Sequence, residues 1–273
     1  MLTAWEEDGF LILDGFHTFD ACEKLRARAL EIVEAFDPQD NATIFSTTDP
    51  DHVDDDYFRG SGDKIRCFLE EEAVGQNGRS TRPKSLSVNK IGHAMHDLDP
   101  VFSSFARAPQ MEPLITGLGI GEPLLLQSMY IFKQPEIGGE VTCHQDSTFL
   151  WTEPQTCIGF WSAIDAASIE NGCLWAEPGS HRGPLRARHH DVDGRLVFET
   201  LDDTPWPSDG LAAIEAQPGT LVVLHGQLPH LSAPNRSTKP RHAHTLHVID
   251  GRAHYPRDNW LRRGADMPLR GFR

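Results

Sequence analysis

Short apolar runs separated by turn-forming residues make up the sequence from residue 124 onward. The runs are rich in Leu, Val, Ile, Phe and Trp, and they lie at Leu124–Phe132, Cys157–Ile164, Cys173–Ala176, Thr220–His225 and Arg241–Ile249. Turn signals such as Asn171-Gly172 and Pro218-Gly219 stand between them. Many short strands joined by tight turns are typical of a sandwich or a jelly roll, so we predict a mainly β fold.

The N-terminal segment follows a different pattern, a short strand and then a helix. Phe10–Leu13 is an apolar run that ends at Asp14-Gly15. Asp20, with Glu23 three residues later, predicts a capping box at the start of a helix. No internal repeat and no shift in composition divides the chain. We predict one domain over residues 1–273, with a helix-rich N-terminal third packed on the β core.

Residues 49–56 form an acidic stretch with five Asp. Their spacing does not match an EF-hand loop, which disfavours a cation site. We interpret the stretch as a solvated loop, long enough to act as a mobile lid over a site.

The charge balance excludes several classes of partner. The chain has 25 basic and 40 acidic residues, a net charge of −15, which repels the phosphates of nucleic acids and anionic lipids. It has no apolar stretch long enough to cross a membrane, and its N-terminus lacks the basic segment of a signal peptide.

The chain has five cysteines, an odd number, and they are widely spaced and form no CxxC pair. This pattern is typical of free thiols in a reducing compartment, so we expect a cytoplasmic protein.

The motif with the clearest chemistry is His144-Gln145-Asp146. On an extended chain, residues i and i+2 point to the same side, so His144 and Asp146 can reach one metal ion. Non-haem iron commonly uses two histidines and one carboxylate on one face, which leaves positions open for substrate and oxygen. The third ligand is then a distant histidine.

Two histidines near the end of the Thr220–His225 run are candidates, His225 and His230. Each is followed eleven residues later by an arginine, Arg236 or Arg241. The arginine matters because a guanidinium can bind the carboxylate of a dicarboxylate cosubstrate through two hydrogen bonds. Arg241 begins a predicted strand, whereas Arg236 lies in a turn. A rigid strand positions a ligand better, so we favour His230 with Arg241.

Two other groups have weaker signals. His242, His244 and His247 have a spacing that could bind zinc, but His247 is expected on the opposite strand face from the other two. Residues 182–195 contain four Arg and two His, which could meet an anionic substrate. Because Asp191 and Asp193 interrupt this segment, we interpret it as a solvated loop.

Several longer motifs resemble the phytanoyl-CoA dioxygenase family, and in particular its phytanoyl-CoA dioxygenase domain-containing protein branch. The resemblance runs from Trp5 to Leu261. It rests on four segments: residues 87–96 (SVNKIGHAMH), residues 129–135 (MYIFKQP), residues 144–146 (HQD) and residues 170–181 (ENGCLW, then PGSH).

The resemblance implies a double-stranded β-helix, a cupin-like jelly roll with flanking helices. It also implies Fe(II), 2-oxoglutarate and O₂, with ascorbate as a supporting reductant. By motif, His144, Asp146 and His230 take the places of the catalytic metal ligands, because Ser232, Asn235 and Arg241 follow His230 as in the family. Arg241 would hold the distal carboxylate of 2-oxoglutarate. Four further residues match positions that line the cosubstrate pocket: Lys90, Met129, Trp161 and Ser232.

The sequence therefore predicts a dioxygenase that hydroxylates a small-molecule or acyl substrate and releases succinate and CO₂. Asp146 favours hydroxylation over halogenation, since related halogenases lack this carboxylate. Phe149, Leu150 and Trp151 are predicted to form an apolar wall for the substrate. Two alternatives stay open, a non-catalytic β-helix module that has kept a metal site and a zinc hydrolase on a cupin-like barrel.

Overall fold

The computed structural model describes residues 1–38, 43–45, 56–76 and 79–272. The acidic stretch therefore lies outside the described residues, except for Asp56 at the start of helix α3 (Asp56–Arg59). No helix among the described residues is long and apolar enough to span a membrane.

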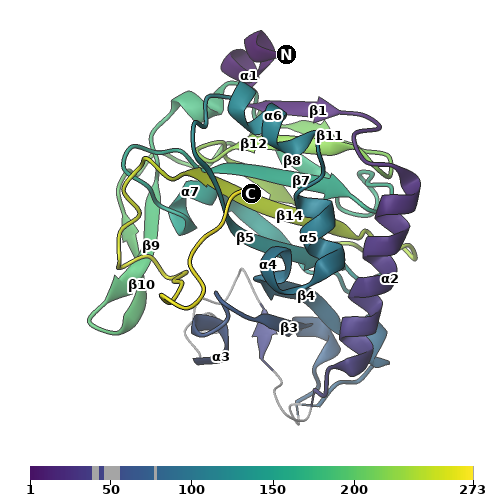
Figure 1. Cartoon of the computed structure of the whole chain (residues 1–273). Coiled ribbons are helices and arrows are strands. Elements are labelled where there is room, and N and C mark those ends of the chain that lie inside the picture. The colour runs from purple at the N-terminus through teal and green to yellow at the C-terminus, as the bar shows by residue number, and fades with distance from the viewer. Residues whose placement is uncertain (39–42, 46–55, 77–78, 273) are drawn as a thin grey trace.

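Two β-sheets face each other and form the core of the molecule (Figure 1). The larger sheet has eight strands in the order β1 (Phe10–Leu13), β12 (Leu221–His225), β7 (Ile158–Ala163), β14 (Ala243–Asp250), β5 (Pro123–Ile131), β4 (Val88–His93), β3 (Ile65–Glu70) and β2 (Ile44–Phe45). The smaller sheet has four, in the order β11 (Ala212–Ile214), β8 (Leu174–Ala176), β13 (His230–Ser232) and β6 (Val141–His144). All pairings except that of β2 with β3 are antiparallel, and two facing antiparallel sheets confirm the predicted jelly roll.

The strand register decides which side chains enter the space between the sheets. Gly92, Met129, Thr245 and Trp161 are direct neighbours across β4, β5, β14 and β7. Trp161 packs with Leu174 of the smaller sheet, so this row faces the interior. Since side chains alternate along a strand, every second residue from Arg241 to His247 belongs to the same inner face.

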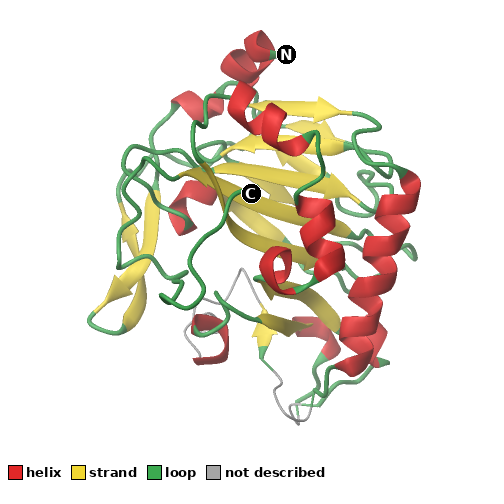
Figure 2. Cartoon of the chain, in the orientation of Figure 1, coloured by secondary structure: helices red, strands yellow, loops and turns green. Residues whose placement is uncertain are grey.

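Helices cover the outer face of the larger sheet (Figure 2). They are α2 (Phe19–Ala35), α4 (Met95–Leu98), α5 (Pro100–Ala106) and α6 (Met111–Gly117), with α1 (Leu2–Asp8) at its end. Apolar side chains on one side of α2, including Leu25 and Val33, pack against Tyr130 and Phe132. Helix α2 therefore shields this part of the outer face of the larger sheet from water.

Two details of the sequence predictions are wrong. Thr18, not Asp20, caps α2, because its hydroxyl accepts the Ala21 amide at 3.2 Å, while Asp20 pairs with Lys24. The basic segment is not a loop but a hairpin of β9 (Ala187–Val192) and β10 (Arg195–Thr200).

Candidate metal and cosubstrate site

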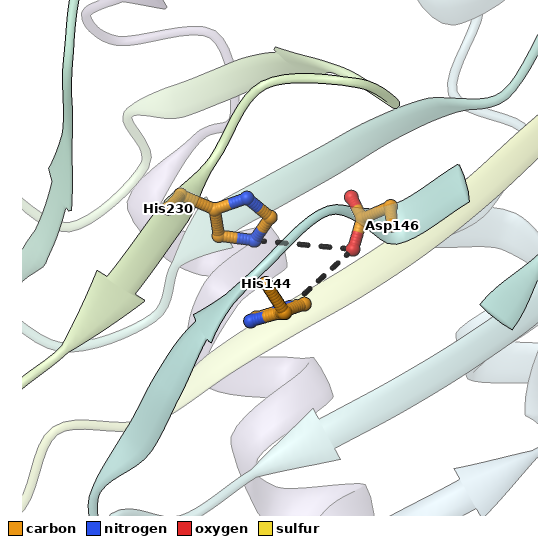
Figure 3. A group of neighbouring side chains, drawn as sticks. All are labelled: His144, Asp146 and His230. Atoms are coloured by element: carbon orange, nitrogen blue, oxygen red, sulfur yellow. Dashed lines mark ion pairs between the residues drawn. The ribbon is translucent and has the colours of Figure 1, made fainter. Parts of the chain in front are cut away.

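The HxD motif and His230 come together at one end of the smaller sheet. His144 ends β6, and His230 begins the neighbouring strand β13, directly opposite it in the register. Gln145 keeps the chain extended, so Asp146, the first residue of α7 (Asp146–Phe149), points to the same side as His144. Figure 3 shows the three side chains converging.

The distances suit a shared metal ion. Nε2 of His144 lies 3.7 Å from Oδ1 of Asp146, and Nε2 of His230 lies 3.8 Å from the same oxygen. One ligand atom from each of the three residues lies within 4.8 Å of the others. Two imidazoles and one carboxylate are the donor set that non-haem Fe(II) oxygenases use.

Backbone carbonyls fix both imidazoles in the orientation that metal binding needs. Nδ1 of His144 lies 2.9 Å from the Thr142 carbonyl, and Nδ1 of His230 lies 3.0 Å from the Leu228 carbonyl. A carbonyl oxygen can only accept, so each Nδ1 carries the proton and each Nε2 presents its lone pair.

Electrostatics keep His230 and Asp146 in the protonation states that bind a cation. Burial, assisted by His144, lowers the pKa of His230 to about 4, so its imidazole is neutral at pH 7. Burial alone would raise the pKa of Asp146, but the surrounding histidines outweigh this effect and hold it well below its usual value. A neutral imidazole and an ionised carboxylate are the forms that ligate metal ions.

Arg241 is a buried cation on the inner face, two residues before β14 begins. Its side chain is 1% exposed, and its Nε donates to the Gly172 carbonyl at 3.1 Å. Its guanidinium carbon lies 5.3 Å from the centre of the Trp161 ring, and its Nη1 has no hydrogen-bond partner in the part of the chain described. The nearby Asp165 is already paired with Arg26 at 2.6 Å. A buried guanidinium with an unused donor fits the carboxylate of a bound anion.

The other predicted pocket residues also lie in the interior. Met129 and Trp161 flank Thr245, whose buried hydroxyl has no partner among the described residues. Nζ of Lys90 lies 3.9 Å from the Met129 sulfur and 3.3 Å from the centre of the Phe45 ring. The hydroxyl of Ser232 accepts a hydrogen bond from Lys133 at 2.9 Å. Lys90, Met129 and Trp161 thus lie on the inner face of the larger sheet, and Ser232 lies in the smaller sheet, two residues after His230.

The rejected alternatives lie elsewhere. The His225 ring packs 5.6 Å from Trp5 and 5.1 Å from His181, and among the described residues it is not part of the group of ligand atoms around Asp146. Arg236 pairs with Glu72 at 2.6 Å, and both side chains are about half exposed. His242 bonds Tyr130 on the outer side of the sheet, so the HxHxxH residues do not gather into one site.

The three residues predicted to form the substrate wall have different surroundings in the structure. The Phe149 ring lies 6.0 Å from His144, beside the candidate metal ligands. Leu150 is buried in an apolar cluster against which Phe149 also packs, and its amide donates to the Asp146 carbonyl at 3.1 Å. Trp151 packs under the guanidinium of Arg188 at 5.0 Å. Of the three, Phe149 is the one whose ring lies beside a triad side chain among the described residues.

Three residues near the site were not among its predicted members. His247 and Gly159 adjoin Asp146 from β14 and β7, and Lys133 contacts Ser232. The contacts of His247 and Lys133 join residues far apart in the chain, and Gly159 carries no functional group, so spacing alone gives no signal for them. Lys133 belongs to the MYIFKQP motif and lies two residues after β5. Its place in that motif was the signal in the sequence that could have pointed to a role in the site.

Comparison with known proteins identifies the family. Residues 5–243 match the family model described as "Phytanoyl-CoA dioxygenase (PhyH)". A phytanoyl-CoA dioxygenase of Arabidopsis thaliana is 42% identical over 271 residues, covering 98% of this chain and 94% of its own. The phytanoyl-CoA dioxygenase domain-containing protein 1 of Mus musculus is 41% identical over 281 residues, covering 98% and 96%.

Solved structures agree on the fold. The non-heme alpha ketoglutarate dependent epimerase SnoN from nogalamycin biosynthesis superposes with a TM-score of 0.65 over 99% of this chain and 96% of its own, at 15% identity. At 15% identity, this similarity supports the assignment of the jelly-roll fold and nothing further. The family match and the curated relatives carry the enzyme class, a dioxygenase. The chain belongs to the phytanoyl-CoA dioxygenase family.

Proposed function

We propose that this chain is an Fe(II)- and 2-oxoglutarate-dependent dioxygenase that hydroxylates a small-molecule or acyl substrate. The overall reaction is balanced as substrate plus 2-oxoglutarate plus O₂ giving hydroxylated substrate, succinate and CO₂. The observation that carries the proposal is that two features border the space between the sheets. The first is the group of two histidines and one aspartate, and the second is the buried Arg241, whose Nη1 has no partner among the described residues.

His144, Asp146 and His230 would hold Fe(II). The iron, when bound, supplies the activation of O₂ that drives cosubstrate decarboxylation and substrate oxidation. The protein's part is to hold the ligands still, and the bonds to the Thr142 and Leu228 carbonyls do this for both imidazoles. Because Asp146 provides a carboxylate ligand, we propose hydroxylation rather than halogenation.

Arg241 would bind the distal carboxylate of 2-oxoglutarate through its unused Nη1. Trp161 lies against the guanidinium and keeps it in place. Ser232 and Thr245 each offer a buried hydroxyl on the walls of the same space. Lys90 and Met129 would close another part of the wall, and the burial of Lys90 helps to exclude water from the reacting groups.

We propose that the substrate is either an acyl-CoA or a free small molecule. The Arabidopsis relative carries the name phytanoyl-CoA dioxygenase, whereas the mouse relative is named only for its domain. Phe149, beside His144, offers an apolar contact that suits the hydrocarbon part of either. The five cysteines are free thiols, which supports a reducing compartment, and we propose the cytoplasm.

The test is succinate release by the purified protein supplied with Fe(II), ascorbate and 2-oxoglutarate. Slow succinate formation is expected without substrate, and faster formation with the correct member of a panel of acyl-CoAs and free metabolites. An anaerobic titration of Fe(II) and 2-oxoglutarate should give a metal-to-ligand charge-transfer band in the visible. A protein that binds iron but never consumes 2-oxoglutarate would be a non-catalytic metal-binding module. Hydrolysis dependent on zinc would favour the zinc hydrolase instead.

A further inference from the structure

Lys133 is a second buried basic residue beside the proposed cosubstrate pocket. It follows β5 by two residues and is 2% exposed. Its Nζ donates to the hydroxyl of Ser232 at 2.9 Å and to the carbonyl of Gly139 at 2.8 Å. The acid whose charge acts on it from β3, Glu70, has its oxygens bonded to the Gly139 amide and to Asn89. Lys133 is therefore held by dipoles and not by a direct carboxylate partner.

Lys133 and Arg241 converge on one glycine. The carbonyl of Gly172 accepts Nε of Arg241 at 3.1 Å, and a methyl group placed on its Cα would fall 2.3 Å from Cε of Lys133. The backbones also meet, since the Arg241 amide donates to the Lys133 carbonyl at 3.3 Å. A positive charge on Lys133 beside that of Arg241 is unfavourable in a desolvated site unless an anion joins the two groups. The cluster of Lys133, Arg241 and Ser232 is therefore suited to a carboxylate.

Resting on the function proposed above, we propose that Lys133 is a positioning residue and second cation of the cosubstrate site. Its bond to Oγ of Ser232 uses a lone pair of that oxygen, which leaves the serine O–H free to donate to the distal carboxylate of 2-oxoglutarate. The ammonium then shares the charge of that carboxylate with Arg241. This role explains why a lysine is buried where a neutral side chain would pack at lower cost.

The protonation of Lys133 offers a readout that a purely structural role would not give. Burial, and then the charge of Arg241, lower the pKa of Lys133 to about 6, against the opposing effects of Glu70, Glu140 and Cys173. At pH 7.5 the free protein therefore holds this amine mostly neutral. A bound carboxylate stabilises the ammonium, so cosubstrate binding should take up a proton from solution.

The experiment is anaerobic calorimetry of 2-oxoglutarate binding to the Fe(II)-loaded protein, in two buffers of different ionisation enthalpy. At pH 7.5 the wild type should take up about one proton per 2-oxoglutarate, and less at pH 6. Lys133→Met should abolish the uptake and weaken binding by roughly 10- to 100-fold. Lys239→Met, which removes an exposed lysine from the same loop region, should match the wild type.

A second ligand separates a specific role from a general disturbance. 2-Oxopentanoate has the length of 2-oxoglutarate but no distal carboxylate, so Lys133→Met and wild type should bind it equally. Unchanged proton uptake in Lys133→Met, or equal loss of both ligands, would overturn the proposal. If Lys133→Met does not fold, the wild type alone decides, because absence of proton uptake at pH 7.5 also overturns it. A wild type that binds neither oxo acid would instead contradict the proposed function itself.

Discussion

His247 contacts the oxygen of Asp146 that faces away from the other two histidines. Its Nε2 lies 3.3 Å from Oδ2, whereas His144 and His230 lie 3.7 and 3.8 Å from Oδ1. The two carboxylate oxygens are thus divided between the larger sheet and the proposed metal. This contact orients Asp146 so that one oxygen is available to the ion.

Replacing His247 should therefore weaken metal binding without removing a ligand. Outer partners of metal ligands typically contribute roughly 10- to 100-fold in affinity, and we expect that loss for His247→Leu. Calorimetry with Fe(II) under argon measures it. The matched control is His254→Leu, at an exposed position, which should bind iron as the wild type does. Equal iron affinity in both variants would remove His247 from the site.

Alanine at any member of the triad should abolish iron binding and turnover. His144→Ala, Asp146→Ala or His230→Ala each leaves only two protein ligands, which we expect to lower Fe(II) affinity by at least about 100-fold. His225→Ala should retain iron, because that ring packs on Trp5 and His181 instead. The ligand assignment is wrong if His225→Ala loses iron while His230→Ala keeps it.

Arg241 should control the affinity for 2-oxoglutarate and leave that for iron unchanged. Removing one partner of a buried ion pair costs roughly 3–5 kcal/mol, so Arg241→Ala should weaken cosubstrate binding by about 10² to 10³. Arg241→Lys keeps the charge but loses the planar fork, and its defect should be intermediate. Arg236→Ala, at a half-exposed pair with Glu72, should stay within a few-fold of wild type. A larger defect in Arg236→Ala would move the anchor to that residue.

Gly159 makes room for the Asp146 carboxylate. A Cβ at this position of β7 would lie 2.5 Å from Oδ2 of Asp146, closer than packed atoms approach. Gly159→Ala should therefore displace the carboxylate and lower iron affinity by roughly tenfold or more. Gly117→Ala, where no neighbour lies within 4 Å of the added carbon, is the control for iron affinity and thermal stability. Unchanged iron affinity in Gly159→Ala would show that Asp146 is not held as described.

Buried histidines on the outer face should make the metal-free protein acid-sensitive. Burial lowers the pKa of His17 and His242 to about 4 and that of His244 to about 3. Between pH 6.5 and 4 the unfolded chain binds more protons than the native one, so stability is full above pH 6.5 and falls as the pH drops through this window.

Urea unfolding at pH 7 and pH 5 measures the effect. Each buried histidine should contribute on the order of 1–2 kcal/mol to the difference between the two pH values. His244→Leu removes an imidazole whose Nε2 has no partner in the described structure, so its pH dependence should be shallower. His254→Leu, at an exposed histidine, should keep the wild-type slope. Parallel slopes in the two variants would contradict this account.

Strands with a strong apolar pattern were predictable from the sequence to within one or two residues. Leu124–Phe132 corresponds to β5, and Cys157–Ile164 corresponds to β7, because turn residues bound both. β6 and β13 were not predictable, since each is short and partly polar and depends on its neighbour for its hydrogen bonds. The β9–β10 hairpin had a readable signal, Asp193-Gly194, where both residues have a positive φ.

The same division applies to the site. The side-by-side placement of His144 and Asp146 follows from two-residue periodicity, so a local pattern was enough. The contacts of His247 with Asp146 and of Lys133 with Ser232 join segments that are more than eighty residues apart in the chain, and Gly159 approaches Asp146 through the packing of β7. Register is set by the packing of the whole sheet, and a single sequence carries no direct record of it.

The position of β14 also dictates when this protein can fold. The strand lies between β5 and β7, yet it follows every other described strand of the larger sheet along the chain. Until it emerges from the ribosome, two long apolar strands have unpaired edges, which are open to wrong pairing with other chains. A nascent chain that stops before residue 243 therefore lacks the middle of its larger sheet, and the core is completed only after β14 has been made.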